Sequence, residues 1–352
     1  MKRILFPIFW VSMGAFFLFA GYWFVAKKPV FSVSQASISQ NLPETKSQPV
    51  VLMAVGDIML GRGTEYMVNK YGKGDFNFLF AKIKNYLLAA DLLFGNLEGS
   101  ISQRGQQVGS IYSFEFSPTS TSALKESGFD VLSLANNHML DYQAIALQDT
   151  LANLQQAGID YVGAGLNEQE AFSLKIREIY PVKSAEGGAE QLNRVKGVKI
   201  GFLAFENLGP ASWKAGGDKT GMAWIGWDDF GKIQEIISQS KQQVDILVVS
   251  LHAGVEYQPL PDNFQKEFTK MAIDSGADLV IGHHPHVIQP LEKYKNGWIA
   301  YSLGNFVFDQ FFSKETMEGG LLKVEIKDKK ISNVILDKVK LNKYYQPELV
   351  VE

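Results

Sequence analysis

The sequence predicts an α/β domain that follows an apolar amino-terminal segment. From Val50 onward, short apolar runs alternate with amphipathic stretches at helical spacing, as in strands connected by helices. Several apolar runs end in Asp, Asn or His, and the carboxyl ends of strands are where α/β sheets bind ligands. With 46% hydrophobic and 20% charged residues over 352 positions, the chain is also suited to a substantial buried core.

The composition excludes several classes of site and partner. The chain has no cysteine, which rules out disulfides, thiolate metal sites, iron–sulfur clusters and cysteine nucleophiles. Four of the 34 Lys and Arg residues lie in the first 28 positions, so the remainder carries 30 basic against 37 acidic side chains, a formal charge of −7. Nucleic-acid binding depends on clustered Lys and Arg, so we expect no nucleic-acid partner.

Residues 4–26 form an uncharged stretch of 23 residues. As a helix rising about 1.5 Å per residue it would be roughly 34 Å long, enough to cross the hydrocarbon core of a bilayer. Trp10, Tyr22 and Trp23 would then lie near the two membrane interfaces. We therefore predict a single-pass anchor over residues 1–28. A cleaved signal peptide is the alternative, although its apolar region would be shorter and would end in an Ala-x-Ala-like site.

A tether and a large domain follow the predicted anchor. Residues 29–49 are rich in Ser and Gln with flanking prolines, which is typical of a flexible linker. The globular pattern occupies residues 50–345 and contains no internal repeat. A single amino-terminal span before a long cysteine-free domain favours an outside location, so we expect a cell-membrane protein whose carboxyl-terminal domain is extracytoplasmic.

The first half of the domain predicts strands that deliver polar residues at their carboxyl ends. The predicted strands cover residues 51–55, 91–94, 131–134 and 161–165, with helices over 77–90, near 121–127 and over 143–157. Asp57 follows the first strand, Asn96 and Glu98 the second, and Asn137 and His138 the third. We expect these side chains to contribute to one site.

The second half repeats the pattern with histidines at strand ends. Predicted strands at residues 199–205, 245–251, 279–282 and 298–303 are accompanied by helices over 228–240 and 263–275, and alternating strands at 321–326 and 331–341 close the domain. The Gly- and Trp-rich stretch 207–227 is either a lid or polymer-binding surface, or a long connection packed by Trp213, Trp224 and Trp227. We favour the connection.

Three of the five histidines are His283, His284 and His286, directly after a predicted strand. One interpretation is a turn whose histidines hydrogen-bond locally, but several nitrogen donors converging on one point favour a metal site. His138 and His252 also follow predicted strands. The candidate metal ligands are therefore Asp57, Asn96, Glu98, Asn137, His252, His283, His284 and His286.

Carboxylate, amide and imidazole ligands in one site suit Mn, Fe, Zn or similar divalent ions. The number of candidate groups is enough for two ions. A two-metal centre activates water and holds both oxygens of an in-line displacement, which is the chemistry of phosphoester cleavage.

The strand-end residues belong to motifs that resemble those of the CapA family of capsule-synthesis proteins. The motifs, in order over residues 51–309, are Val55-Gly-Asp-Ile-Met-Leu-Gly-Arg62, Gly95-Asn-Leu-Glu98, Leu134-Ala-Asn-Asn-His138, Leu251-His-Ala-Gly-Val-Glu-Tyr257, Gly282-His-His-Pro-His-Val-Ile-Gln289 and Tyr301-Ser-Leu-Gly-Asn-Phe306. That family belongs with poly-γ-glutamate biosynthesis proteins and resembles the calcineurin-like metallophosphatases. The resemblance implies a layered α/β/β/α metallophosphatase-like fold that binds divalent metal.

The resemblance also implies roles for individual positions. Asp57 matches the first metal-binding Asp, Asn137 the metal-binding Asn, and His138 the catalytic His that contacts substrate. His252 and the later histidines match the remaining metal ligands. Which two of the later three bind metal is open, with His284-Pro285-His286 the best match to the family's His-x-His end.

The sequence departs from the metallophosphatase pattern at two positions. Asp57 is followed by Ile58 and Met59 where the first motif is Asp-x-His, so one imidazole ligand is missing. Asn96 stands where the second motif has Asp, which makes Glu98 the expected bridging carboxylate. Both departures leave open whether the centre acts as an ordinary phosphatase.

Three further residues are expected near the site. Arg62 is a candidate catalytic residue that would hold a carboxylate or phosphate bidentately, and a surface position on the next helix is the alternative. Asn305 and Asp309 would lie beside the site, with capping of a strand end as the alternative.

The sequence thus predicts a membrane-anchored component of poly-γ-glutamate capsule biosynthesis or export with a metallophosphatase-like metal site. Its expected partners are the membrane, through residues 4–26, other capsule-synthesis membrane subunits and an anionic polymer substrate. One alternative is a metal-dependent phosphoesterase or hydrolase that acts on a cell-envelope polymer. The other is a non-catalytic assembly subunit.

Overall fold

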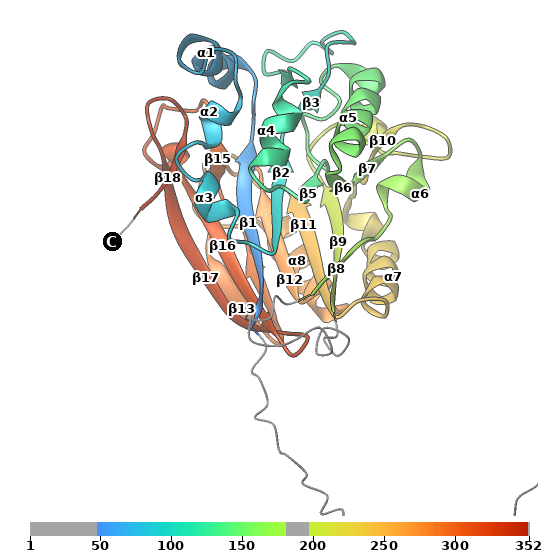
Figure 1. The fold of residues 1–352 in the computed structure, drawn as a ribbon. Coiled ribbons are helices and arrows are strands. Elements are labelled where there is room, and N and C mark those ends of the chain that lie inside the picture. The colour runs from blue at the N-terminus through green and yellow to red at the C-terminus, as the bar shows by residue number, and fades with distance from the viewer. Residues whose placement is uncertain (1–47, 181–196, 351–352) are drawn as a thin grey trace, which may run out of the picture. The chain divides into compact units, whose positions relative to one another are not determined.

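Two β-sheets pack face to face with helices on their outer faces in the computed structural model, which describes residues 48–180 and 197–350 (Figure 1). The first sheet has eight strands, in the order β18 (Pro347–Leu349), β17 (Lys330–Leu341), β16 (Glu318–Lys327), β1 (Val50–Ile58), β2 (Leu92–Leu97), β5 (Val131–Ser133) and β6 (Asp160–Val162), with β15 (Asn305–Val307) also paired to β1. Strands β1, β2, β5, β6 and β15 are parallel, so their carboxyl ends share one edge.

The second sheet has six strands, in the order β13 (Leu291–Tyr294), β14 (Gly297–Ala300), β12 (Leu279–His283), β11 (Ile246–His252), β9 (Val198–Glu206) and β8 (Lys175–Ile179). The four central strands are parallel, and the two edge strands are antiparallel to their neighbours. Two small ribbons complete the described strands: β3 (Ser100–Ile101) with β4 (Glu115–Phe116), and β7 (Ala164–Gly165) with β10 (Gly221–Met222).

Helices cover the outside of both sheets. Those of the first half are α1 (Arg62–Tyr71), α2 (Asn77–Phe80), α3 (Lys84–Leu87), α4 (Ser120–Glu126), α5 (Gln143–Ala157) and α6 (Glu168–Ala171), and those of the second half are α7 (Phe230–Lys241) and α8 (Asn263–Asp274). In Figure 1, α4 lies in front of the first sheet and α7 lies beside the second.

Apolar side chains fill three layers. Between the sheets, Phe94 of β2 stacks on Phe202 of β9 with ring centroids 5.4 Å apart. Leu147 of α5 belongs to the cluster outside the first sheet, and Phe268 of α8 packs on Phe205 of β9 outside the second. Each large apolar side chain buried in this way stabilises the fold by roughly 1.5–3 kcal/mol. The layers follow the order helix, sheet, sheet, helix, and the predicted α/β class is confirmed.

The chain crosses from the second sheet to the first between β14 and β15, and both sheets approach this crossing closely. A Cβ atom on Gly56 would lie 1.9 Å from the carbonyl oxygen of Gly304, and one on Gly282 would lie 1.9 Å from that of Tyr301. Only glycine fits at these two positions. Each glycine directly precedes a candidate ligand, Asp57 or His283, so the crossing brings the two strand ends together.

The predicted helix over residues 77–90 is wrong in its length. The structure has two four-residue helices there, α2 and α3, joined by turns in which Ala81 and Ile83 donate to carbonyls three residues earlier. The carbonyl of Phe78 accepts a hydrogen bond from Gln346, far along the chain, instead of continuing the helix. This long-range contact could not be predicted from helical spacing.

The long stretch 207–227 packs as a connection. Trp213 joins the edge of the core outside the first sheet, and Trp224 Nε1 donates to the carbonyl of Gly209 at 2.8 Å. Trp227 is more exposed but contacts Phe264 of α8. The aromatic side chains of this stretch are used in packing, as the favoured interpretation expected.

The predicted anchor over residues 1–28, including the membrane stretch 4–26, lies outside the described residues, as does nearly all of the predicted linker over residues 29–49. Within the part of the chain that the structure describes, no helix has both the length and the apolar character needed to cross a membrane. The membrane anchor therefore stays a prediction.

Candidate metal centre

All five histidines lie at the edge where the parallel strands of both sheets end, at the top of Figure 1. In the first sheet Asp57 is paired in register with Asn96, and in the second sheet His252 is paired with His283. Parallel pairing places these residues at one level, and sheet packing places the two rows opposite each other. Segments far apart in the sequence thus supply one site.

Asp57 is fully buried and contacts His283, His284 and His286 of the segment 283–286, which we call the histidine turn. Its Oδ1 accepts a hydrogen bond from Asn96 Nδ2 at 2.9 Å and lies 3.1 Å from His283 Nδ1. Its Oδ2 accepts from the backbone N–H of His284 at 3.2 Å and lies 3.4 Å from His286 Nδ1. Burial opposes ionisation, but the hydrogen bonds from His283 and His286 outweigh it and hold the pKa of Asp57 well below its ordinary value. Asp57 is therefore an anion at neutral pH.

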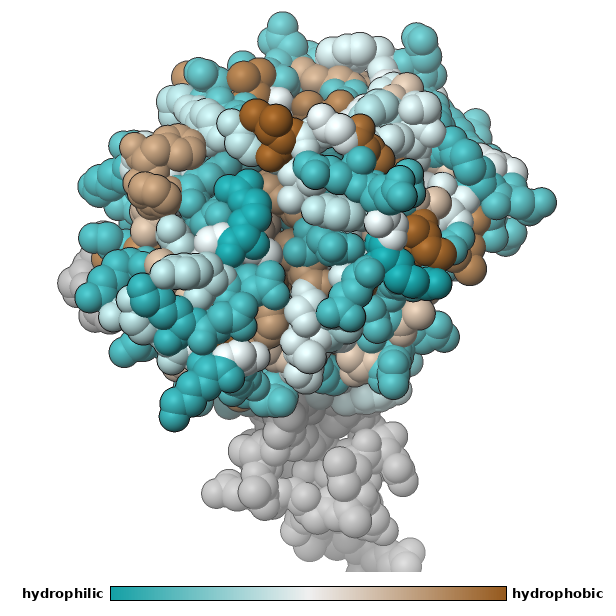
Figure 2. Space-filling model, turned by 90° about the horizontal axis from the view of Figure 1, so that it is seen from above, coloured by the Kyte–Doolittle hydropathy of each residue, from teal (hydrophilic) through white to brown (hydrophobic). Residues whose placement is uncertain are grey.

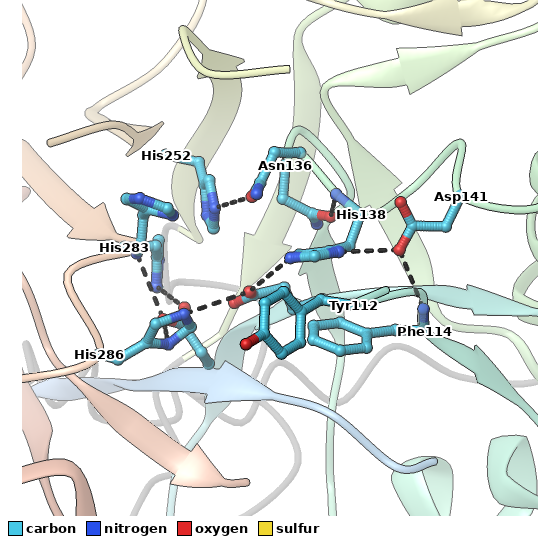
Figure 3. A network of polar contacts seen from close by, with 12 residues as sticks. Tyr112, Phe114, Asn136, His138, Asp141, His252, His283 and His286 are labelled. Atoms are coloured by element: carbon cyan, nitrogen blue, oxygen red, sulfur yellow. Dashed lines mark hydrogen bonds and ion pairs between the residues drawn. The ribbon is translucent and has the colours of Figure 1, made fainter. Parts of the chain in front are cut away.

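Glu98 is a second buried carboxylate, and its Oε1 has no hydrogen-bond partner. This oxygen lies 3.9 Å from His138 Nε2 and 3.7 Å from His286 Nε2. Figure 3 shows the rings of His138 and His286 turned toward the same part of the site. Burial, followed by the negative charges of Asp57 and Glu256, raises the pKa of Glu98 well above its ordinary value. A buried carboxylate oxygen without a donor needs an explanation, and a bound cation supplies one.

The ring of His286 is oriented by Asn305. Asn305 Nδ2 donates to the carbonyl oxygen of Thr316 at 2.9 Å and to Gln310 Oε1 at 3.0 Å, so its Oδ1 faces His286 Nδ1 at 3.0 Å. That contact places the ring proton on Nδ1. The lone pair of Nε2 is left facing Glu98, which is the usual arrangement of a metal-binding imidazole and its hydrogen-bonding partner.

His252 and His284 are buried as neutral imidazoles. Burial lowers the pKa of His252 well below its ordinary value, and burial together with the nearby His286 lowers the pKa of His284 to about 3. His252 Nε2 lies 2.8 Å from Asn137 Oδ1, while His284 Nδ1 is buried without a partner. Neutral imidazoles are the form that binds metal. His284 Nδ1 is free to serve as a ligand, whereas the two nitrogens of His252 face the side-chain amides of Asn137 and Asn96.

His283 differs from its two neighbours in the histidine turn. Its Nδ1 contacts Asp57, and its ring centroid lies 6.3 Å from that of Phe94 in the core between the sheets. His283 therefore lies between Asp57 and the core, where its Nδ1 helps to orient the carboxylate of Asp57. His284 and His286 are left as the candidate metal ligands of the turn.

His138 pairs with Asp141, a residue that the sequence analysis missed. His138 Nδ1 lies 2.8 Å from Asp141 Oδ2, which also accepts a hydrogen bond from the backbone N–H of Phe114 at 2.9 Å. The Phe114 ring stacks on the imidazole with centroids 3.9 Å apart (Figure 3). Two contacts therefore fix the His138 ring with its Nε2 facing Glu98. A carboxylate three residues after a candidate catalytic histidine was the available signal.

The amide of Asn96 is oriented by Asn136. Asn136 Nδ2 donates to the carbonyl of Leu97 at 2.8 Å and to Asn96 Oδ1 at 3.3 Å. The Nδ2 of Asn96 consequently faces Asp57 Oδ1 and, at 3.3 Å, His252 Nδ1. In this arrangement Asn96 offers hydrogen atoms, and no oxygen, to the group of candidate ligands.

Arg62 and Asp309 bind each other. Arg62 donates from Nε and a terminal nitrogen to the two carboxylate oxygens of Asp309, at 3.1 and 2.7 Å. The backbone N–H of Gly63 donates to the same carboxylate at 2.9 Å, and the guanidinium lies 4.9 Å from the ring centroid of Phe114. The guanidinium nitrogens of Arg62, which were expected to hold a substrate group, are therefore bonded to Asp309 instead.

A cleft of ≈ 540 Å³ opens above His138 and His286. Figure 2 looks onto this face, where mostly hydrophilic side chains surround a hollow. The cleft is lined by acidic residues, Glu256 and Asp309, and by aromatic residues such as Tyr112 and Phe312, while Arg62 is the only Lys or Arg among its lining residues. The cleft is therefore not basic.

Among residues 48–180 and 197–350, two groups of side chains have ligand atoms close enough together to hold a divalent ion. One comprises Asp57, Glu98 and His252, all buried, and the other comprises Glu256, His284 and His286; within each group the ligand atoms all lie within 4.8 Å of one another. The unpartnered Glu98 Oε1 and His284 Nδ1 belong to these groups, so the residues present fit a divalent metal.

The chain matches, over residues 51–310, the sequence model of the family described as "Bacterial capsule synthesis protein PGA_cap". The chain belongs to this family. It is 34% identical to "Capsule biosynthesis protein CapA" of Bacillus anthracis over 302 residues, which are 84% of this chain and 68% of that one. It is 32% identical to "PGA biosynthesis protein CapA" of Bacillus subtilis (strain 168) over 275 residues, 78% of this chain and 67% of the relative.

Among solved structures, the chain is similar to the crystal structure of a novel phosphatase of Mycoplasma pneumoniae. That similarity has a TM-score of 0.45 and 15% sequence identity, and it covers 84% of this chain and 94% of the phosphatase chain. The resemblance to the CapA family that the motifs indicated is confirmed by the family match and by the two relatives.

The capsule-synthesis family motifs contain residues whose place in the site was not predicted. Glu256 stands four positions after His252 and reaches His284 and His286. Asn136, in the third motif, orients Asn96 and donates to the backbone of β2. Their signal was membership of the motifs, but only the fold shows which side chains they contact.

Proposed function

We propose that the chain is a membrane-anchored component of capsule biosynthesis that binds divalent metal where its two sheets meet and acts on an anionic polymer such as poly-γ-glutamate. The observation that supports it most is the buried carboxylate of Glu98, whose unpartnered Oε1 faces two imidazoles beside the anionic Asp57. The two relatives with capsule and PGA biosynthesis names support the biological process.

The residues proposed to hold metal are Asp57, Glu98, His252, His284 and His286. Two carboxylates and three imidazoles suit Mn, Fe or Zn, and we propose two ions. When bound, these ions would supply positive charge that polarises a substrate oxygen. The protein itself supplies the dry, hydrogen-bonded surroundings that orient each ligand.

His138 is proposed to transfer a proton at Nε2. Asp141 holds Nδ1 at 2.8 Å and thereby fixes which ring nitrogen carries hydrogen, while Nε2 faces the cleft side of Glu98. A positioned imidazole of this kind contributes typically about 10²–10⁴-fold to a rate. Stacking on Phe114 keeps the ring in place.

Binding of an anionic polymer at this cleft should depend on the metal. The only Lys or Arg of the lining, Arg62, is already paired with Asp309, and Glu256 adds negative charge. Like charges repel an anionic substrate unless a cation compensates them. We therefore expect polymer affinity to fall when metal is removed.

The membrane part of the proposal is supported by the sequence alone. The uncharged stretch 4–26 and the Ser- and Gln-rich residues 29–49 would tether the domain to the outer side of the cell membrane, beside other capsule-synthesis subunits. Cleavage of the domain by protease added to intact protoplasts would support this topology, and protection of the domain would contradict it.

The test of the metal centre uses the full-length chain purified in detergent. Elemental analysis should find bound divalent metal, and Asp57→Ala and His286→Ala should lower it. Binding of poly-γ-glutamate should require metal, and His138→Ala in the native host should lower polymer production while metal content stays unchanged. A wild-type chain without metal, together with full polymer production in all three variants, would overturn the proposal.

The second candidate function is a metal-dependent phosphoesterase or hydrolase that acts on another cell-envelope polymer. The pairing of His138 with Asp141 beside the candidate ligands favours it, because a purely structural metal site needs no oriented acid–base residue. Cleavage of a chromogenic phosphodiester that His138→Ala abolishes would support this function. Absence of turnover with every substrate class, with normal metal content, would favour a non-catalytic assembly subunit.

A further inference from the structure

Glu256 lies on the loop that leads from β11 to α8, at the mouth of the cleft. The loop is attached to the histidine turn by two backbone hydrogen bonds: Ala253 N donates to the carbonyl of His283 at 3.2 Å, and Tyr257 N donates to that of Pro285 at 2.8 Å. These bonds hold the intervening Glu256 above His284 and His286. Its carboxylate comes within 4.8 Å of a ligand nitrogen of each.

The two imidazoles each have a nitrogen available for a ligand. His286 Nδ1 is engaged by Asn305, which leaves Nε2. His284 is 6% exposed, and its Nδ1 has no hydrogen-bond partner. An unpartnered buried nitrogen destabilises the fold unless a ligand satisfies it.

The backbone of the histidine turn is held in an unusual conformation that orients these rings. His284 and His286 have φ of 98° and 57°, in the left-handed region that residues with side chains rarely adopt. Such conformations are strained and persist where the surroundings determine them. The turn is therefore constrained to present both imidazoles on the side where Glu256 lies.

We propose that Glu256, His284 and His286 form an outer cation position, in which Glu256 supplies the carboxylate ligand. This inference rests on the proposed metal centre and assigns its second ion. The inner group of Asp57, Glu98 and His252 is fully buried, whereas Glu256 is exposed. The outer ion should consequently bind more weakly and exchange faster with solution than the inner one. Two imidazoles and one carboxylate make this position suitable for Mn, Fe or Zn.

The experiment titrates the metal-free, full-length chain with Mn²⁺ by calorimetry and counts bound ions by elemental analysis. The wild-type chain should bind two ions with different affinities. Glu256→Gln should bind the second ion at least about tenfold more weakly, since loss of even an indirect contact to a metal costs about 10–100-fold. Glu256→His, which replaces the carboxylate ligand with an imidazole ligand, should keep two ions. The matched control Glu235→Gln, at an exposed glutamate of α7, should leave both affinities unchanged.

The outcomes separate this inference from the metal centre on which it rests. Two ions with unchanged affinities in Glu256→Gln, or a single ion in the wild-type chain, would overturn the outer position and leave the metal centre intact. A wild-type chain that binds no Mn²⁺ would overturn both. Loss of only the weaker ion in Glu256→Gln, with its recovery in Glu256→His, would establish the assignment.

Discussion

A single buried carboxylate, Glu98, connects the stability of the domain to its metal content. In the metal-free chain its Oε1 has no donor, and burial with nearby negative charges raises its pKa well above the ordinary value. A carboxyl group of this kind favours folding below its ordinary pKa, and this contribution is lost as the pH rises through the folded-state pKa. Asp57 acts in the opposite sense, because its pKa is lowered: its contribution is present at neutral pH and lost on acidification.

The first prediction concerns Glu98→Gln. In chelator at about pH 8, the variant should unfold at a higher temperature than the wild-type chain, because a neutral amide replaces a buried carboxyl group whose ionisation the folded state opposes, a change of roughly 1–3 kcal/mol. Added divalent metal should raise the unfolding temperature of the wild-type chain more than that of the variant, which keeps Glu256, His284 and His286 but lacks a carboxylate of the buried group. A lower melting temperature for metal-free Glu98→Gln at this pH would contradict this account.

The second prediction concerns Asp141→Asn. The amide can no longer hold the His138 Nδ1 proton as the carboxylate does, so any reaction that uses His138 should slow by roughly 10²-fold or more. Bound metal should stay the same, since Asp141 belongs to neither candidate ligand group. Metal content by elemental analysis and polymer production in cells measure the two effects. Equal loss of both would show that Asp141 supports the fold and not the acid–base role.

The third prediction concerns Glu206, the last residue of β9, which is buried beside the site edge. Burial raises its pKa to about 7, although its Oε2 accepts hydrogen bonds from the backbone of Leu208 and Gly209. Its favourable contribution should be present below its ordinary pKa and be lost as the pH rises through about 7. The stability of Glu206→Gln relative to the wild-type chain should therefore increase as the pH is raised from about 5 to about 9, by roughly 3 kcal/mol at most. Melting curves at both pH values check this, and parallel curves would refute it.

At the scale of elements, the histidine turn depends on β15 for its geometry. Asn305, at the start of β15, holds the His286 ring, and the carbonyl of Thr316 holds the Asn305 amide. Asn305→Ala is expected to weaken metal binding by about 10–100-fold without removing a ligand. Asn333→Ala, at an exposed position of β17, is the matched control. Metal titration of both variants tests this fourth prediction, which equal affinities would contradict.

The strand ends are the elements that the sequence predicted best. Apolar runs that stop at Asp57, Asn96, His252 and His283 were recognisable because buried strands are continuous in sequence and their ends are polar. The break between α2 and α3 was not recognisable from helical spacing, and the adjoining α2 also bonds to Gln346, at the other end of the domain, through the carbonyl of Phe78. Local pattern predicts elements, whereas long-range contacts decide where they stop.

The site itself was predictable in its composition and not in its contacts. The motifs contain nearly all of its side chains. Which histidines of the turn can bind metal depends on the crossing between the sheets, because that crossing brings His283 against Asp57. The pairing of Arg62 with Asp309 likewise joins residues 247 positions apart. Such contacts follow from the packing of two sheets, which no short motif records.

At the scale of the molecule, the candidate ligands come from both sheets, so a bound ion would link them. Asp57 lies in β1 and Glu98 directly follows β2 of the first sheet, whereas His252 ends β11 and His284 and His286 follow β12 of the second. A ligand present at about 100 times its dissociation constant stabilises the folded state by about 2.7 kcal/mol. The fifth prediction is that metal slows hydrogen exchange in β1, β2, β11 and β12 and has little effect on β17 and β18. Protection confined to one sheet, measured by mass spectrometry, would contradict it.

The wide spacing of these ligands along the chain also sets when the protein can acquire its metal. Asp57 lies near the start of the domain, whereas His286 and its partner Asn305 lie far along it, with β16, β17 and β18 of the first sheet still to follow. No nascent fragment that lacks the second sheet contains a complete ligand group, because each group includes a histidine from that sheet. A metal ion would therefore be acquired only after His252 has been synthesised, and its identity would depend on which metals are available in the compartment where folding finishes.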